Sequence, residues 1–227
     1  MVKWKNSLKL KNAQIIWLGH ASFLIKTKQG KKLYIDPFGL ESVKTKLEPA
    51  DLIIISHEHF DHFSEKDIQL ILNTNTKLIA YKGVKEKSLN IPESKFDEIG
   101  EGGETESEGI KIRAIPAYNP AKRFHPKGFG TGFLINIDGE YIYWAGDTDL
   151  IPEMDRLKVI GIAAALLPIG GTYTMDLEEV KKANELINPK YFVPMHYNKI
   201  PGTQVKEYKL DNLEKEVKNI YFLTPLE

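Results

Sequence analysis

The segment that most constrains this chain is the histidine-rich run SHEHFDH, residues 56–62. It directly follows LIII, a continuous apolar run that predicts a strand buried on both faces. Side chains two residues apart in extended backbone point the same way, so His57 and His59 are expected on one side of the loop. A turn into a helix would then let Asp61 and His62 face a second position nearby. The segment therefore predicts a site with two places for a metal ion.

Imidazole and carboxylate groups suit Zn²⁺, Mn²⁺ or Fe, with open positions left for water. The chain contains no cysteine, so any metal ion must rest on nitrogen and oxygen ligands. We expect one or two divalent ions, with Zn²⁺ first and Mn²⁺ or Fe as alternatives. A thermolysin-like H-E-x-x-H site is excluded, because the residue four after His57 is Asp61. The alternative is a loop in which the histidines occur by chance and bind no metal.

Two later segments place further metal-binding groups at strand ends. GDTD (residues 146–149) follows an expected strand and would project Asp147, a carboxylate that could bridge two ions. PMHY (residues 194–197) likewise ends a strand and offers His196. Alone, the first motif is usually a turn and the second a structural histidine. Beside the histidine-rich run, they complete a second site together with Asp61 and His62.

The remaining patterns predict one α/β domain of two packed sheets over residues 1–227, because no linker or repeat divides the chain. Residues 98–109, rich in glycine and glutamate, are expected to be a solvated hairpin region. We expect strands at 14–17, 22–26, 32–35, 52–55, 77–81, 110–116, 133–137, 141–144, 163–167, 191–194 and 220–223. We expect helices at 64–72, 84–89, 176–187 and 204–217. Ser64 is expected to cap the first of these, and Asp176 and Glu179 are expected to open the third with a capping box.

Charge and hydropathy limit the partners. The 31 basic and 31 acidic residues cancel, which leaves no net charge to recruit nucleic acid. The first 14 residues lack the apolar core of a signal peptide, and the longest apolar stretch is far short of the ~20 residues that span a bilayer. We therefore expect a cytoplasmic protein with a small-molecule substrate, and neither nucleic acid nor a membrane as partner. Assembly into a homo-oligomer stays open.

In combination, HEHFDH, GDTD and PMHY resemble the metallo-β-lactamase superfamily. LGHASFLI (18–25), IDPF (35–38), LLPIGGTYTM (166–175) and VPMHYN (193–198) resemble its branch of small metal-dependent hydrolases near the ascorbate-6-phosphate lactonases. The resemblance covers about residues 14–225. It implies a four-layer αββα sandwich with a dinuclear metal site at the edge of the two sheets.

The resemblance also assigns roles to particular residues. It implies six ligands: His57 and His59 for the first ion, Asp61, His62 and His196 for the second, and Asp147 as a bridge. Asp36 in IDPF resembles the carboxylate that orients the ligand loop, with a turn-capping aspartate before Pro37 as the alternative.

One position departs from the family pattern. The family usually adds a third histidine to the first ion, at a strand end where this chain has AYNP with Asn119. Either Asn119 or water takes that place, or His125 reaches in from the following FHPK segment. A surface position for His125 is the alternative.

The implied chemistry is hydrolysis of a small ester, lactone or phosphoester by metal-activated water. Asp61, His20 and Tyr118 are the candidate catalytic residues, and a buried structural role is the alternative for His20. Further candidates for substrate contacts are Tyr173, Tyr197 and His125, and the basic residues Lys122, Arg123 and Lys127, which could instead form a solvated loop. A non-catalytic metal- or ligand-binding protein with an incomplete first site is the rival hypothesis, and a nucleic-acid-processing hydrolase is a weaker one.

Overall fold

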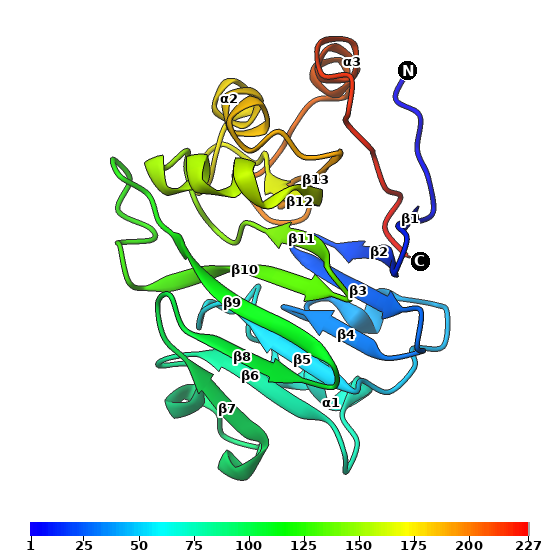
Figure 1. Cartoon of the computed structure of the whole chain (residues 1–227), viewed down its shortest axis with the longest axis vertical. Coiled ribbons are helices and arrows are strands. Elements are labelled where there is room, and N and C mark those ends of the chain that lie inside the picture. Colours follow the sequence, from blue (N-terminus) through cyan, green and yellow to red (C-terminus); the bar gives the residue numbers. More distant parts are fainter. Residues whose placement is uncertain (227) are drawn as a thin grey trace.

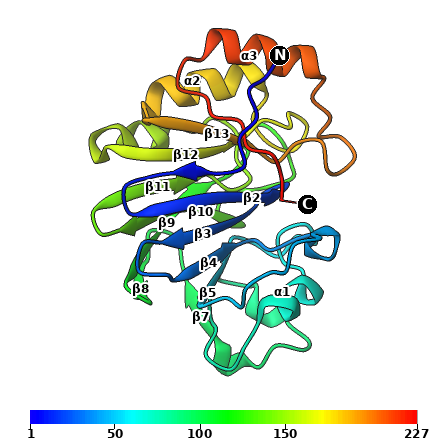
Figure 2. The same ribbon diagram turned by 90° about the vertical axis from the view of Figure 1, so that its right-hand side faces the viewer.

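The computed structural model describes residues 1–226, which form two mixed β-sheets packed face to face with helices on both outer sides (Figures 1 and 2). The first sheet has seven strands in sequence order: β1 (Leu8–Lys9), β2 (Ala13–Gly19), β3 (Ser22–Thr27), β4 (Lys32–Ile35), β5 (Leu52–Ile55), β6 (Lys77–Tyr81) and β7 (Phe96–Ile99). Its strands are antiparallel from β1 to β4 and parallel from β4 to β7.

The second sheet has six strands in the order β13-β12-β11-β10-β9-β8. They are β8 (Glu104–Ser107), β9 (Ile110–Ala117), β10 (Gly130–Ile137), β11 (Glu140–Trp144), β12 (Ile162–Pro168) and β13 (Tyr191–Met195). Strands β8 to β11 are antiparallel, whereas β11, β12 and β13 run parallel. Each sheet thus joins an antiparallel half to a parallel half.

The helices cover the outer faces. Helix α1 (Glu65–Ile71) lies on the first sheet, and α2 (Leu177–Ile187) and α3 (Glu207–Glu216) lie on the β12–β13 side of the second, as Figure 2 shows. Four 3-10 helices are η1 (Leu40–Ser42), η2 (Lys85–Lys87), η3 (Glu93–Lys95) and η4 (Pro152–Ile160). No helix among residues 1–226 combines the length and apolarity needed to cross a bilayer.

Two hydrophobic clusters hold the layers together. The larger lies between the sheets and continues under α2 and α3, and the smaller lies between the first sheet and α1. Along strand β5, side chains point alternately into the two clusters. Leu52 and Ile54 belong to the larger cluster, and Ile53 and Ile55 belong to the smaller one. The expected strand buried on both faces is confirmed, and so is the four-layer αββα sandwich.

Several sequence expectations need correction. The segment 220–223 forms two isolated bridges, Lys5 with Leu223 and Phe192 with Ile220, and no strand. Helix α3 begins only at Glu207. The expected helix at 84–89 is the short η2, and β1, β7, η1, η3 and η4 are not among the expected elements. In the hairpin region expected at 98–109, β8 pairs antiparallel with β9. The predicted domain ends at residue 227, which lies outside the described residues.

Two helix starts show which capping signals were informative. Asp176 forms the expected capping box with Glu179, because its carboxylate accepts the Glu179 amide and the Glu179 side chain accepts the Asp176 amide. Ser64 occupies the N-cap of α1 but makes no capping bond, since its hydroxyl donates to Asp67. The capping role expected for Ser64 is therefore wrong.

Candidate metal centre

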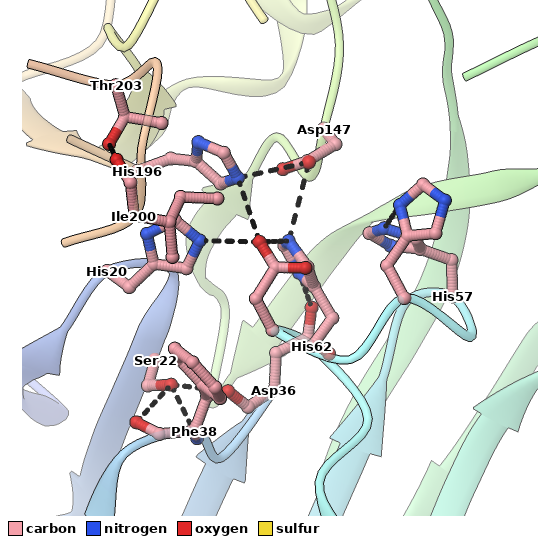
Figure 3. Close-up of polar contacts among 12 residues, drawn as sticks. His20, Ser22, Asp36, Phe38, His57, His62, Asp147, His196, Ile200 and Thr203 are labelled. Atoms are coloured by element: carbon pink, nitrogen blue, oxygen red, sulfur yellow. Dashed lines mark hydrogen bonds and ion pairs between the residues drawn. The ribbon is translucent and has the colours of Figure 1, made fainter. Parts of the chain in front are cut away.

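Six segments that follow strands bring imidazole and carboxylate groups to one edge of the sandwich (Figure 3). The β2–β3 turn carries His20, and the segments after β4, β5, β9, β11 and β13 carry the others: Asp36; His57, His59, Asp61 and His62; Asn119 and His125; Asp147; and His196. The six histidines of the chain, separated by up to 176 residues, gather here. Functional groups commonly collect where strands end in α/β folds.

The first group consists of three histidines, His57, His59 and His125, whose ring nitrogens could hold one metal ion. His57 Nε2 lies 3.0 Å from His59 Nδ1, and His125 Nε2 lies 3.2 Å from the same atom. Phe129 packs against these rings, with its centroid 4.9 Å from that of His59. His125 thus occupies the region where the family pattern led us to expect a third histidine.

The second group consists of His20, Asp61, His62 and His196, all buried. His20 Nε2 lies 2.9 Å from Asp61 Oδ2, and the rings of His20 and His196 lie 4.0 Å apart. Asp61 Oδ2 is 3.7 Å from His62 Nε2 and 3.8 Å from His196 Nε2. His20, a predicted catalytic residue, is therefore an immediate neighbour of the predicted ligands of the second ion.

Asp147 lies between the two groups. Its Oδ2 is 3.2 Å from His125 Nε2 in the first group, and 3.4 Å and 3.1 Å from the Nε2 atoms of His62 and His196 in the second. Its other oxygen, Oδ1, is buried and has no hydrogen-bond partner among the described residues. A carboxylate in this position could contact ions held by either group.

Asn119 does not point at the metal groups as a ligand would; it holds His125. Asn119 Oδ1 accepts from the backbone N–H of His125 at 3.0 Å and lies 2.9 Å from His125 Nδ1. The Asn119 side chain also donates to the carbonyl of Tyr173, and its backbone N–H donates to the carbonyl of His125. An amide oxygen beside Nδ1 fixes the proton there, because that oxygen can only accept. His125 Nε2 is then left with its lone pair toward His59 and Asp147.

Asp36 orients two histidines and does not cap its own turn. It accepts from the Ser56 amide at 2.8 Å, from the Ser56 hydroxyl, and from His62 Nδ1 at 2.6 Å. The Ser56 hydroxyl also lies 2.8 Å from His57 Nδ1, so Asp36 reaches one histidine of each group, one of them through Ser56. Such partners fix the ring orientation and the tautomer of metal-binding histidines. Sequence reasoning gave Ser56 no role, although it directly precedes His57.

The electrostatics favour ionised forms of Asp61 and Asp147, whereas burial raises the pKa of Asp36. Burial raises the pKa of Asp61, but the attraction of His62 and the hydrogen bond from His20 outweigh it and hold this pKa at about 2. Burial likewise opposes the ionisation of Asp147, yet the nearby His196 and His62 place its pKa well below the ordinary value. Burial and the neighbouring His196 lower the pKa of His20 to about 4. For His62, the two carboxylates Asp147 and Asp61 overcome burial and raise the pKa well above 6.5.

Several buried atoms in the centre have no hydrogen-bond partner among the described residues. They are His20 Nδ1, His62 Nε2, His196 Nδ1, His196 Nε2 and Asp147 Oδ1. Buried polar atoms are normally satisfied, because an unmade bond costs about 1–3 kcal/mol each. A divalent cation would use the donor atoms that converge between Asp61, His62, His196 and Asp147, after displacing the proton that the raised pKa of His62 keeps on its ring. The donor set therefore fits a metal ion of the kind that binds nitrogen and oxygen.

The backbone around the centre is strained in a way that aims these side chains. His20, Asp36 and His196 adopt left-handed conformations with φ of 53°, 41° and 57°. Each such residue costs of the order of 1 kcal/mol, and strain of this kind concentrates at functional sites. Gly146, with φ of 71°, makes the turn that projects Asp147, and a Cβ on it would lie 2.6 Å from the Thr131 carbonyl oxygen.

The side chains of Tyr118 and Lys122, which were candidates for contact with the substrate, bind other parts of the protein. The hydroxyl of Tyr118, a candidate catalytic residue, donates to Glu153 at 3.1 Å and not to either histidine group. Lys122 binds Asp149 at 2.7 Å and the carbonyls of Gly171 and Thr174, so it braces two loops and is not a free anion-binding group.

The remaining candidates for contact with the substrate are two basic residues and two tyrosines. Lys127 pairs with Glu153 at 2.9 Å, and Arg123 is exposed. Tyr173 packs against Phe124 with ring centroids 4.8 Å apart, and Tyr197 stacks on Trp17 at 5.3 Å.

Comparison with known proteins identifies the family of the chain. Residues 14–196 match the family model described as the beta-lactamase superfamily domain. Among similar sequences, a UPF0173 metal-dependent hydrolase from Thermococcus kodakarensis is 33% identical and covers 93% of this chain and 96% of its own. A UPF0173 metal-dependent hydrolase from Methanosarcina mazei is 38% identical over 82% of this chain and 83% of its own.

Solved structures show the same fold. A protein from Parabacteroides distasonis, assigned as a metal-dependent hydrolase, superimposes with a TM-score of 0.82 at 30% identity and covers 99% of this chain and 100% of its own. The metallo hydrolase Igni18 from Ignicoccus hospitalis gives 0.77 at 27% identity, covering 96% and 97%. The chain belongs to the metallo-β-lactamase superfamily and, within it, to the UPF0173 metal-dependent hydrolases.

Proposed function

We propose that this enzyme hydrolyses an ester, lactone or phosphoester bond of a small molecule with a metal-activated water. The observation that carries the proposal is the position of Asp147 Oδ2, within 3.4 Å of ring nitrogens from both histidine groups. A carboxylate in that position supports two ions held close together. Two adjacent cations suit displacement reactions at C–O and P–O bonds, because both the attacking and the leaving oxygen need stabilisation.

The proposed ligands follow the two groups in the structure. His57, His59 and His125 would hold the first ion, Asp61, His62 and His196 the second, and Asp147 both. When bound there, a divalent ion lowers the pKa of its water toward ~7 and polarises the substrate oxygen. Zn²⁺ is the first choice for an imidazole-rich set, with Mn²⁺ and Fe as alternatives.

The residues around these ligands set the geometry before substrate binds. Asp36 fixes His62 directly and His57 through Ser56, so the rings need not reorient during the reaction. His20 faces Asp61 through Nε2 and holds that carboxylate in place, which makes it a positioning residue for Asp61. Preorganised groups contribute more to catalysis than mobile ones, because they need no reorganisation as charge develops.

Aromatic side chains border the centre. Phe129 packs on the rings of His57 and His59, and the Phe38 ring lies 5.8 Å from that of His20. Phe60 lies between two predicted ligands in the sequence and is 69% exposed. Its ring centroid is 6.0 Å from that of Phe38. Such a rim suits a small organic substrate, since it offers apolar contact and limits water around the reacting bond. The motifs that resemble ascorbate-6-phosphate lactonases keep lactones among the substrates to test.

The rival hypothesis of a non-catalytic binding protein loses its main support. It rested on an incomplete first site with Asn119 in place of a histidine. His125 would supply a third imidazole to that site, a role supported by its position beside His57 and His59 and by its contact with Asn119.

The test is a screen of phosphodiester, phosphomonoester, lactone and ester substrates with added Zn²⁺, Mn²⁺ or Fe²⁺, comparing the wild type with Asp61→Ala. Asp155→Asn, an exposed acidic position, is the control for purification and charge. We expect activity in the wild type and in the control, and a loss of about 100-fold or more in Asp61→Ala. Full metal occupancy without turnover on any of these classes would refute the proposal, and activity that survives Asp61→Ala would place the chemistry elsewhere.

A further inference from the structure

A cavity of about 440 Å³ adjoins the metal centre on the side of His20. Its walls come from segments far apart in sequence, including Trp4 near the N-terminus, the β2–β3 turn, and the loop that follows β13. Lys44 and Lys199 contribute to the lining, together with His20 and Tyr197. The cavity therefore shares His20 with the proposed catalytic centre, and Tyr197 directly follows the predicted ligand His196.

Among residues 1–226, the lysine and acidic side chains that line this cavity are all of positive charge. Lys44 and Lys199 line it, and no Asp or Glu does so among residues 1–226. Within the same described range, neither lysine forms an ion pair or hydrogen bond with a carboxylate. Four other cavities each have at least one carboxylate in their walls, for example Asp176, Glu104, Glu48 and Glu185. Among the described residues, no carboxylate neutralises Lys44 or Lys199, so their ammonium groups can pair with a ligand.

The loop that carries Lys199 is braced. Asn198, in the left-handed region with φ of 58°, accepts the Val205 amide at 2.7 Å and donates to the Val205 carbonyl at 3.2 Å through its side chain. Its backbone N–H also donates to the carbonyl of Thr203. Figure 3 shows Thr203 and Ile200 of this loop beside His196 and His20. The backbone of Lys199 is therefore held in a loop that hydrogen bonds fix on both sides of it.

The position of the Lys199 side chain links it to the centre. A Cβ built on Gly39 would lie 3.3 Å from Lys199 Cε and 3.5 Å from Nζ, so the lysine folds over Gly39. Gly39 directly follows Phe38, whose ring contacts His20. The ammonium group thus lies over the segment that forms the His20 side of the metal centre.

The remaining walls suit an organic anion. Trp4 is 42% exposed, and its indole offers an apolar face. Tyr197 is almost fully buried and lines the cavity, and a phenol hydroxyl can donate to a ligand. Two ammonium groups and one hydroxyl make a donor set that matches a carboxylate or phosphate.

We propose that this cavity binds an anionic group, a carboxylate or a phosphate, of the substrate while the scissile bond lies at the metal centre. The inference rests on the proposed hydrolase function and narrows its substrate class to acidic small molecules. Lys199 and Lys44 are the residues that select the charge, and Trp4 contacts the adjoining apolar part. Neutral esters of equal size lack this contact and are poorer substrates.

Anion binding can be measured without turnover. Trp4 and Trp17 line the cavity, so the fluorescence of the metal-loaded protein is titrated with succinate and with methyl phosphate. The variants are Lys199→Met and Lys44→Met, which keep an unbranched apolar stem, and Lys158→Met is the control on the distant surface of η4. We expect dissociation constants about tenfold higher in the first two variants and unchanged in the control. The two anions show whether carboxylate or phosphate is preferred.

A kinetic comparison separates this inference from the proposed function. Where the screen gives ester hydrolysis, the ratio of kcat/KM for mono-4-nitrophenyl succinate to that for 4-nitrophenyl acetate is expected to fall about tenfold in Lys199→Met. An unchanged ratio in an active enzyme, or anion binding that is absent in the wild type or equal in all variants, overturns the anion site. Lysine-dependent binding in a protein that hydrolyses nothing would support the anion site and count against the hydrolase.

Discussion

The link between Asn119 and His125 gives the sharpest test of the centre. Replacing Asn119 by Ala removes the oxygen that faces both the backbone N–H and Nδ1 of His125, at 3.0 Å and 2.9 Å. It also removes the donor to the Tyr173 carbonyl at 3.0 Å. The backbone bond from Asn119 to the His125 carbonyl stays, so the loop keeps its path while the ring loses its orientation.

The magnitude follows from the groups left without partners. Asn119 and His125 are 5% and 3% exposed, so solvent reaches neither of them easily. Each buried donor or acceptor that loses its partner costs about 1–3 kcal/mol, and local relaxation or one water molecule would recover part of that. We expect the free energy of unfolding of the metal-free protein to fall by about 2–4 kcal/mol. The affinity of the three-histidine group for Zn²⁺ should fall by about 10- to 100-fold, as for other residues that orient a ligand.

The assay is competition for Zn²⁺ with a chromophoric chelator, with urea unfolding of the metal-free protein measured in parallel. Asn119→Asp is the matched variant, because it keeps an acceptor for both donors of His125 and loses only the donor to Tyr173. It should bind Zn²⁺ within about threefold of the wild type. Wild-type affinity for both ions in Asn119→Ala would refute the reasoning, and so would an Asp variant as weak as the Ala variant.

Three further predictions concern the frame of the site. Gly146→Ala places a Cβ 2.6 Å from the Thr131 carbonyl oxygen at a left-handed φ, so the urea midpoint should fall by the equivalent of about 2–4 kcal/mol; an unchanged midpoint would contradict the packing. Asp36→Asn should weaken Zn²⁺ binding about 10- to 100-fold in the same chelator assay, whereas loss of stability with normal Zn²⁺ affinity would show a purely structural role. Because the folded-state pKa of His62 is raised, its proton stabilises the metal-free protein fully below pH 6.5, and this stabilisation is lost as pH rises through the folded value. Metal must displace that proton, so calorimetric enthalpies of Zn²⁺ binding should depend on the buffer and the affinity should rise with pH; buffer-independent enthalpies would count against it.

The sequence predicted the parts of the site that depend on strand ends. The LIII run places the histidine-rich segment at the end of β5, and the short strands before Asp147 and His196 end at the same edge. Their meeting follows from topology, because the parallel halves of both sheets bring successive strand ends together. The loop residue His125 could be named only as one of several alternatives. Its contact with His59 spans 66 residues and depends on how a loop folds around Asn119, which no periodicity encodes.

The incorrect elements share a physical cause. Residues 220–223 have the composition of a strand, yet they meet their neighbours only at two bridges. Helix η4 was hidden because its apolar end merges with β12, and only Gly161, with φ of 77°, separates them. Strand β7 alternates poorly because it is a sheet edge, with two exposed acidic residues in its centre. In each case tertiary contacts, and not local preference, decide the structure.

The metal centre concentrates buried charge, and this explains how the fold can exist before metal binds. Asp36, Asp61 and Asp147 lie around the single ring of His62, with Asp36 Oδ2 at 2.6 Å from Nδ1 and the other two carboxylates at 3.7 Å and 3.4 Å from Nε2. Buried carboxylates without a compensating charge would be very costly, and Asp147 and Asp61 overcome the effect of burial and raise the pKa of the ring well above 6.5. The proton at His62 Nε2 thus supplies the positive charge that a divalent ion would supply more fully. It follows that these carboxylates need a positive charge nearby for stability, and we expect metal affinity and folding stability to be coupled through His62.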